Sequence, residues 1–244
     1  MKNNTLLFLD FDGVVCDSLP ETLVSSWLAY FEYEKGALPA SMPADFRKRF
    51  LALRPFIRSG EDYLLIQDLL ENHRAVANQA EFDHIIREAG KERMTRYKEN
   101  FYKARTALLE KDRKAWLGLN PLFAHIERAL LKQADNKQIY ILSTKKKEFI
   151  AEIFEGNGIV FDMKRIIYSG SENKQDIITA ELERAKAAGA VFIDDQISHL
   201  VGIRDARIRV FLASWGYVEE SWLSGKEVPV MGEKMAEETI AGWA

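Results

Sequence analysis

The stretch that most constrains the fold is a short apolar run, residues 5–9, that ends abruptly in acidic residues. Its composition is typical of a strand buried on both faces of a parallel sheet. Asp10, Asp12 and Gly13 follow directly, and two carboxylates this close raise each other's pKa unless a cation or hydrogen-bond donors offset their charge. Because open α/β sheets bind ligands at the carboxyl ends of their strands, the segment predicts a cation site, and oxygen ligands favour Mg²⁺. The alternative interpretation is a simple turn, since Asp and Gly are common turn residues.

The overall composition restricts the classes of function. The 244 residues include 47% hydrophobic residues and carry a formal net charge of -3, which is ordinary for a soluble globular protein and predicts no nucleic-acid partner. The single cysteine, Cys16, suits a reducing compartment and is expected to be a small buried residue rather than a nucleophile. No apolar stretch approaches the roughly 18 residues of a membrane span, and the N-terminus is unlike a signal peptide. We therefore expect a cytoplasmic protein with no membrane partner, while the sequence leaves monomer and homodimer open.

The first half of the chain is predominantly helical in pattern. Residues 18–21 fit a capping box with an early proline, which predicts a helix from about Leu19 toward Gly36. From residue 44 to about 113, apolar residues recur at helical spacing without a convincing strand.

After residue 118 the pattern changes to alternating strands and helices. The predicted helices are 122–131, 145–154 and 175–187, and the predicted strands are 138–142, 165–168, 190–193 and 208–212. Such alternation is typical of a parallel sheet with helices on both faces. We predict an α/β fold with a Rossmann-like sheet core, residues 1–18 and 119–244, and an all-helical insertion, residues 19–118. The segment after Trp215 shows no clear pattern.

Polar side chains follow four of the predicted strands. In chain order they are Asp10 with Asp12, Ser143 with Thr144, Lys174 in the loop after the third, and Asp194 with Asp195. The carboxyl ends of parallel strands lie at one edge of a sheet, so we expect these groups to meet in one crevice.

This combination resembles the haloacid dehalogenase-like superfamily of phosphotransferases, and looks most like its branch containing phosphoglycolate phosphatase and β-phosphoglucomutase. The resemblance rests on the opening motif DFDGVVCDS, residues 10–18, and on the order of the later strand-end motifs. It covers residues 4–18 and about 120–215. The insertion matches only in position and helicity, and looks like the family's cap, which closes over the site and excludes water.

The resemblance implies a role for each strand-end residue. Asp10 would be the nucleophile that accepts the phosphoryl group, and Asp12 the general acid and base. Ser143 would hydrogen-bond the phosphate and Lys174 would neutralise it, and Gly13 and Thr144 are expected to contact the substrate. The resemblance also implies a Mg²⁺ ion held by four residues, namely Asp10, Asp12 through its backbone carbonyl, Asp194 directly or through water, and Asp195.

These roles agree with the chemistry of phosphoryl transfer. A carboxylate and a phosphate dianion repel each other, so Mg²⁺ and a lysine are needed to cancel that repulsion and to stabilise charge on the transferring group. The presence of Asp12 disfavours dehalogenation, in which a halide leaves without a proton. Dehalogenases and phosphonatases of the family lack this second aspartate.

Two positions depart from the family's pattern or leave an alternative open. A further acid often lies four residues after the second metal aspartate, where this chain has His199. We expect His199 on a helix surface or in contact with the ligands, rather than as a ligand itself. Three lysines, 145–147, follow Ser143 and Thr144, so Lys145 is an alternative to Lys174 as the phosphate-binding lysine, although the motif order favours Lys174.

The least regular part of the insertion, residues 53–61, carries Arg54 and Arg58 around a proline. Guanidinium groups suit carboxylates and phosphates, so both arginines are candidates for binding an anionic part of the substrate. The equally strong alternative is a loop between helices with solvated arginines.

Taken together, these features predict a Mg²⁺-dependent phosphatase that acts on a small phosphorylated metabolite through an aspartyl-phosphate. The alternatives are a phosphomutase of the β-phosphoglucomutase type, which must keep water from the intermediate, and a catalytically idle regulatory protein on the same fold.

Overall fold

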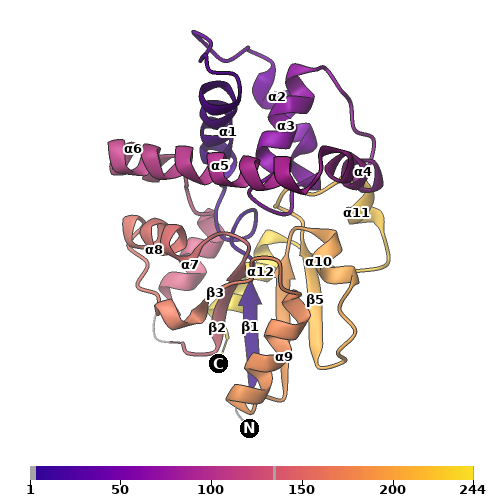
Figure 1. The fold of residues 1–244 in the computed structure, drawn as a ribbon. Coiled ribbons are helices and arrows are strands. Elements are labelled where there is room, and N and C mark those ends of the chain that lie inside the picture. Colours follow the sequence, from indigo (N-terminus) through magenta and orange to yellow (C-terminus); the bar gives the residue numbers. More distant parts are fainter. Residues whose placement is uncertain (1–3, 134–135, 244) are drawn as a thin grey trace. The chain divides into compact units, whose positions relative to one another are not determined.

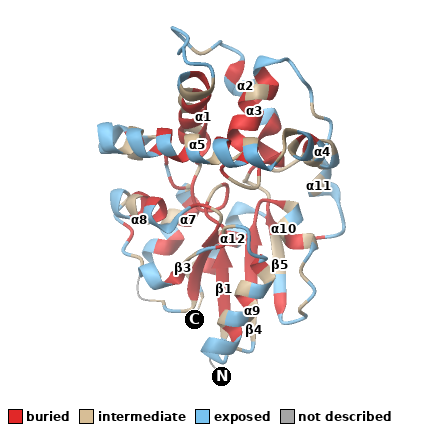
Figure 2. Cartoon of the chain, viewed as in Figure 1, coloured by how far each residue is buried: buried red, intermediate tan, exposed pale blue. Residues whose placement is uncertain are grey.

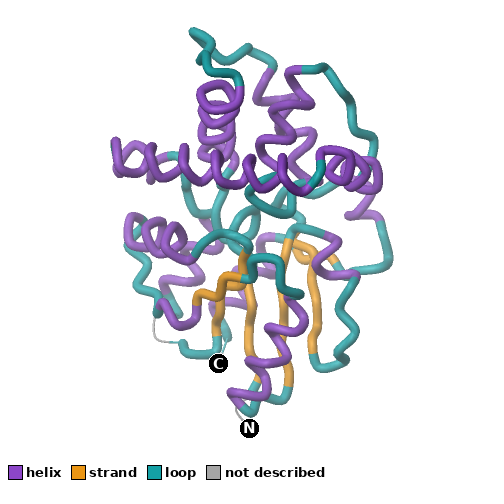
Figure 3. Tube along the Cα trace, viewed as in Figure 1, coloured by secondary structure: helices purple, strands orange, loops and turns teal. Residues whose placement is uncertain are grey.

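The computed structural model describes residues 4–133 and 136–243, and the chain divides into two compact units. The α/β unit comprises Met1–Asp17 and Pro121–Ala244, and the helical unit comprises Ser18–Asn120. Among the described residues, every strand belongs to the α/β unit, whereas the helical unit contains only helices and loops (Figure 3).

A six-stranded parallel sheet, in the order β3-β2-β1-β4-β5-β6, forms the centre of the α/β unit. Its strands are β1 (Thr5–Leu9), β2 (Ile139–Ser143), β3 (Ile166–Tyr168), β4 (Gly189–Asp194), β5 (Ile208–Ala213) and β6 (Val230–Met231). β1 is a central strand, since Leu7 pairs with Ile139 on one side and with Val191 on the other. This position explains its continuous apolar sequence, because both faces of the strand are buried (Figure 2).

Helices cover both faces of this sheet. The helical elements of this unit are α7 (Ala124–Leu131), α8 (Lys147–Gly156), the 3₁₀ turn η3 (Met163–Arg165), α9 (Lys174–Ala185), α10 (Ile197–Val201), α11 (Glu220–Ser224) and α12 (Glu233–Ala241). Ile178 of α9 and Leu200 of α10 pack against the face that carries Leu6 and Phe8. α7 packs against α12, and Figure 1 shows α9 in front of the sheet and α12 behind it.

The strand order places a topological switch point at β1. The chain adds β2 and β3 on one side of β1 and then crosses to the other side for β4 and β5. Connections to the two sides of β1 diverge at the carboxyl ends of β1 and β4, which is where open α/β sheets bind their ligands. The predicted α/β architecture is therefore confirmed, and the switch point selects one edge of the sheet as the place to look for chemistry.

The helical unit is a bundle with an aromatic core. Its elements are α1 (Leu19–Leu28), the π-helical turn η1 (Ala29–Glu34), α2 (Phe46–Leu53), the 3₁₀ turn η2 (Arg54–Phe56), α3 (Asp62–Glu71), α4 (Gln79–Ala89), α5 (Lys91–Lys111) and α6 (Arg113–Gly118). The ring of Tyr63 stacks between Phe50, at 6.3 Å, and Phe101, at 4.8 Å between centroids. These aromatic residues form a packing seam between helices, as their three-to-four spacing indicates.

One local prediction in this unit is wrong, because the capping box does not form. Ser18 is the N-cap of α1, but its side chain makes no capping hydrogen bond. Glu21 instead forms a bidentate ion pair with Arg105, at 2.7 and 2.9 Å, and both side chains are almost fully buried. An unpaired buried carboxylate costs more free energy than an uncapped helix end does, so Glu21 pairs with Arg105, 84 residues away, rather than capping the helix.

Candidate active site

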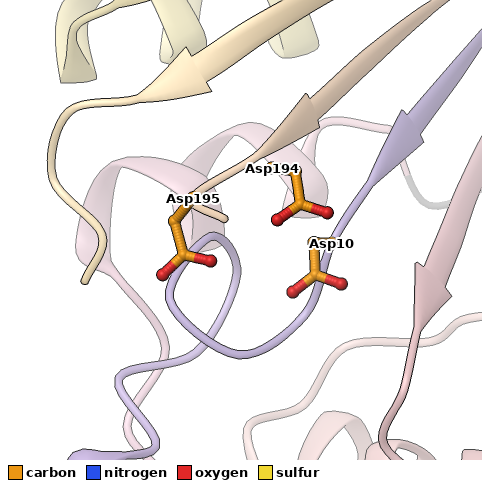
Figure 4. Close-up of side chains that lie close together, drawn as sticks. All are labelled: Asp10, Asp194 and Asp195. Atoms are coloured by element: carbon orange, nitrogen blue, oxygen red, sulfur yellow. The ribbon is translucent and has the colours of Figure 1, made fainter. Parts of the chain in front are cut away.

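Three carboxylates converge at the carboxyl ends of the two central strands. Asp10 follows β1, Asp194 ends β4 and Asp195 comes next in the chain. One oxygen from each of the three lies within 4.8 Å of the others, and all three residues are buried (Figure 4). Oxygen ligands at such a spacing suit a small, hard divalent cation, so the residues present fit Mg²⁺.

Lys174, the first residue of α9, lies between two of these carboxylates. Its Nζ donates to Asp10 Oδ1 at 2.6 Å and to Asp194 Oδ2 at 2.7 Å. Burial acts to lower the pKa of Lys174, but the two carboxylates outweigh it and raise that pKa above its ordinary value. Burial raises the pKa of Asp10 well above its ordinary value despite the lysine, with Asp194 and Asp195 adding to the effect. Two of the three carboxylates thus share Lys174, and a divalent cation would add positive charge to the cluster and favour the ionised form of Asp10.

Asp194 is held by three protein donors. Its Oδ2 contacts Lys174 and His199 Nδ1, the latter at 2.9 Å, while its Oδ1 accepts the backbone N–H of Gln196 at 2.8 Å. Burial acts to raise the pKa of Asp194, but Lys174 and His199 outweigh it and hold that pKa below its ordinary value. His199 thus contacts an acidic residue of the cluster, in the manner expected for a group that orients a ligand.

The second lysine of the site, Lys145, lies beside Asp12. Its Nζ contacts Asp12 Oδ1 at 2.9 Å, and its own side chain is fully buried. The backbone N–H of Lys145 also donates to Ser143 Oγ at 3.2 Å, which fixes the hydroxyl at the end of β2. The sequence left Lys145 and Lys174 as alternatives, whereas the structure places both beside acidic residues of the site, Lys145 on Asp12 and Lys174 on Asp10 and Asp194.

Asp195 is packed by two glycines. Gly13 has φ +89°, and a Cβ atom there would lie 1.9 Å from Asp195 Oδ2. A Cβ atom on Gly216 would lie 2.4 Å from Cβ of Asp195. The backbone N–H of Tyr217 donates to Asp195 Oδ2 at 2.8 Å. Both glycines are therefore required by the close approach of backbone to this carboxylate.

The chain is similar in structure to solved hydrolases along almost its whole length. With a haloacid dehalogenase-like hydrolase from Streptococcus pneumoniae it shares 20% identity over 96% of each chain, with a TM-score of 0.62. A predicted phosphatase from Clostridium acetobutylicum is 16% identical over 97% of each chain, with a TM-score of 0.60. A predicted phosphoglycolate phosphatase from Haemophilus somnus is 14% identical over 90% of this chain and 89% of its own, with a TM-score of 0.59. No family model matches the sequence, and neither does any curated protein.

This is the haloacid dehalogenase-like fold. The prediction of that fold from the strand-end motifs is confirmed, and the sequence identities are too low to carry activity or substrate across. In this fold, four of the residues singled out from the sequence end a strand or follow its carboxyl end, namely Asp10, Asp12, Ser143 and Asp195. Lys174 begins α9 and reaches the same edge of the sheet through its contacts with Asp10 and Asp194. No helix among residues 4–133 and 136–243 combines the length and the apolar character needed to cross a bilayer.

Arg54 and Arg58, the two candidates of the helical unit, both contact other side chains of that unit. Arg54 is 5% exposed, and its guanidinium lies 5.5 Å from the centre of the Tyr63 ring. Arg58 forms a half-buried ion pair with Asp83. Substrate binding by Arg58 would therefore compete with this ion pair. The guanidinium of Arg54 lies over an aromatic ring instead, which leaves a cation–π contact rather than an ion pair with Asp83.

Asp62, the first residue of α3, is a buried carboxylate, and it predicts that the stability of the protein depends on pH. Burial raises the pKa of Asp62 to about 6, although its Oδ2 accepts the backbone N–H groups of Arg58 and Ser59, at 2.9 and 3.1 Å. Since the folded pKa lies above the unfolded value of about 3.9, the folded state binds more protons in between, and stability falls as pH rises from about 4 to 6. Asp62→Asn keeps an oxygen for both N–H groups, so it should raise the free energy of unfolding by up to about 3 kcal/mol at pH 8 and have little effect at pH 4.

Urea unfolding at several pH values measures this effect. Asp112→Asn is a matched control, because Asp112 is an exposed N-cap that accepts from Ala115 N–H at 2.9 Å, and asparagine caps equally well. An Asp62→Asn protein that is equally or less stable than the wild type at pH 8 would contradict the raised pKa.

Sequence reasoning missed the segment after β5. The sequence after Trp215 shows no clear pattern, so no site residue was predicted there. In the structure this segment approaches the loop after β1 and Asp195, through Trp215, Gly216 and Tyr217. A signal was available, because this segment also follows the carboxyl end of a strand, β5, and so lies at the same edge of the sheet as the acidic residues.

Proposed function

We propose that this protein is a Mg²⁺-dependent phosphatase that hydrolyses a small phosphorylated metabolite through an aspartyl-phosphate on Asp10. The observation that carries the proposal is the buried cluster of Asp10, Asp194 and Asp195, bridged by Lys174 at the switch point of a haloacid dehalogenase-like fold. Three buried carboxylates clustered beside a lysine suit a cation and a transferring phosphate better than they suit a structural core.

The residues that would hold Mg²⁺ are the three clustered carboxylates, with Asp12 contributing its backbone carbonyl. Asp194 already accepts three protein hydrogen bonds, which favours contact with the ion through water, whereas Asp10 and Asp195 would bind it directly. When bound, the ion supplies positive charge that offsets the repulsion between carboxylate and phosphate.

In the first step, a carboxylate oxygen of Asp10 attacks phosphorus, and the bond from phosphorus to the ester oxygen breaks. Asp12 in its acid form gives its proton to the departing oxygen, so that an alcohol leaves. Lys174 stays beside Asp10 and balances the charge that gathers on the transferring oxygens, and the Ser143 hydroxyl donates a hydrogen bond to the phosphate. Lys145 contacts Asp12 Oδ1 and so orients the Asp12 side chain.

In the second step, Asp12 as a carboxylate removes a proton from water, and the water oxygen attacks the phosphorus of the aspartyl-phosphate. The bond between phosphorus and the Asp10 oxygen breaks, which releases inorganic phosphate and restores both aspartates. Water must therefore be admitted only after the first product has formed. We assign that control to the helical unit, in the role of a cap, with Arg54 as the first candidate for an anionic part of the substrate.

A screen of phosphorylated metabolites, with p-nitrophenyl phosphate and acetyl phosphate as general substrates, tests the proposal. We expect release of inorganic phosphate in the presence of Mg²⁺, and its loss when EDTA removes the ion and its return when Mg²⁺ is restored. Absence of phosphate release from every substrate would reject the phosphatase. An isomeric phosphorylated product with little free phosphate would instead identify a mutase.

A further inference from the structure

The segment Trp215–Tyr217, between β5 and α11, touches the loop after β1 at three places. The indole Nε1–H of Trp215 donates to the carbonyl oxygen of Val14 at 3.0 Å. Gly216 lies so close that a Cβ atom there would be 2.6 Å from the Gly13 carbonyl oxygen. The phenol of Tyr217 donates to Asp17 Oδ1 at 2.7 Å. This loop carries Asp12, so the segment bears on the geometry of the proposed general acid.

Tyr217 makes a second contact, from its backbone rather than its ring. Its N–H donates to Asp195 Oδ2 at 2.8 Å, so one residue contacts both Asp195 and Asp17. Tyr217 is 9% exposed, and both bonds end on carboxylates, which makes them stronger than bonds between neutral groups. Tyr217 therefore links Asp195, through its backbone N–H, to Asp17, through its phenol.

Asp17 is the last residue of the first segment of the α/β unit, next to the point where the helical unit begins. Its backbone N–H donates to the carbonyl oxygen of Pro121 at 2.9 Å, and Phe123 N–H donates to that of Val15 at 3.0 Å. Two segments of the α/β unit, the one that leads into the helical unit and the one that follows it, are therefore hydrogen-bonded to each other. The phenol of Tyr217 adds a hydrogen bond to the first of these segments, at the side chain of Asp17.

We propose, on the basis of the function proposed above, that Tyr217 is a positioning residue that locks the loop of Asp12 and Asp17 to Asp195. Its N–H fixes the carboxylate of the ion site, and its phenol fixes the end of the loop that carries the general acid. The ring alone cannot do the second task, so the hydroxyl group has a function separate from packing.

Tyr217→Phe tests this separation, because it keeps the ring and the backbone N–H and removes the hydroxyl group that donates to Asp17. Hydrogen–deuterium exchange should show faster exchange at the N–H groups of Asp17 and Phe123, about tenfold for the loss of a hydrogen bond to a charged group. Tyr140→Phe is the matched control, since the Tyr140 phenol accepts a bond from Arg184 at 3.3 Å at the far end of β2. Exchange at the N–H groups of Asp17 and Phe123 that equals the wild type's would overturn the proposal, whether or not the protein hydrolyses phosphates.

Kinetics give the second test. Tyr217→Phe should lower kcat roughly 10-fold with KM and the calorimetric affinity for Mg²⁺ close to those of the wild type, since the substrate and ion contacts remain. Asp17→Asn retains an acceptor oxygen and should keep most of the activity, whereas Asp17→Ala should match Tyr217→Phe, and the double variant Tyr217→Phe/Asp17→Ala should be no slower than either single one. Additive losses in the double variant, or an unchanged kcat in Tyr217→Phe, would overturn the positioning role.

Phosphate release by the wild type tests the enzymatic function, whereas the comparison of Tyr217→Phe with the wild type tests the role of the Tyr217 hydroxyl. If the wild type releases no phosphate, the phosphatase is rejected, while faster exchange at the N–H groups of Asp17 and Phe123 in Tyr217→Phe still supports the positioning role. If the wild type is an active phosphatase and Tyr217→Phe behaves as the wild type in both measurements, only the positioning role is lost.

Discussion

Asp10→Asn is expected to lower the rate of phosphate release by at least about 10³-fold while leaving the protein folded. An amide oxygen is far less nucleophilic than a carboxylate and cannot form the acyl phosphate, so the two-step route is closed at its first step. The substitution preserves side-chain volume in a buried position, and it removes a carboxylate whose pKa burial already raises. Lys174 keeps Asp194 as a partner at 2.7 Å. The melting temperature should therefore change by only a few degrees, about the effect of 1 kcal/mol.

The measurement is a single-turnover assay with rapid acid quench, in which the wild type accumulates phosphate bound covalently to protein and Asp10→Asn does not. Asp162→Asn is the matched control, because Asp162 is an exposed N-cap of η3, where asparagine caps as well as aspartate. Retention of more than about a tenth of the wild-type rate by Asp10→Asn would exclude Asp10 as the nucleophile, since a nucleophile cannot be removed at so small a cost.

The α/β architecture is predictable from the sequence because its signals are local. The apolar run that becomes β1 lies between two strands and is buried on both faces, so nothing but a strand of a parallel sheet fits it. β6 carries no such signal, because Val230–Met231 is two residues long and exists only by pairing with Leu212 and Ala213 of β5. α6 was missed for a similar reason, since its six residues are too few to show a period.

The grouping of the acidic residues is also predictable, because topology alone brings strand ends together. Topology does not predict which atoms of these residues come into contact. Lys145 and Lys174 occupy comparable places in the chain, and only the packed structure assigns one to Asp12 and the other to Asp10 and Asp194. The capping box fails in the same way, because a match over four residues contains no information about Arg105, which lies 84 residues away. Long-range electrostatic partners therefore decide the details that local patterns leave open.

Gly13→Ala is expected to have the other large effect, because it places a methyl group where Asp195 has its carboxylate. The added Cβ would lie 1.9 Å from Asp195 Oδ2 and 2.9 Å from the Tyr217 ring, far inside contact distance. Either the carboxylate or the loop must move, and the φ of +89° adds strain of about 1–2 kcal/mol for any side chain. We expect the affinity for Mg²⁺ to fall by roughly 100-fold, as for the loss of a well-placed ligand group, and the rate of phosphate release to fall with it.

Gly158→Ala separates the two causes in this prediction. Gly158 has φ +71°, but a Cβ atom there would meet nothing within 4 Å. It should therefore lose the same 1–2 kcal/mol or so of unfolding free energy to backbone strain and retain the wild-type affinity for Mg²⁺. Urea unfolding and calorimetric Mg²⁺ titration of both variants make the comparison. If Gly13→Ala binds Mg²⁺ as tightly as Gly158→Ala does, then Asp195 is not a ligand of the ion, because a ligand displaced by a methyl group cannot keep its coordination unchanged.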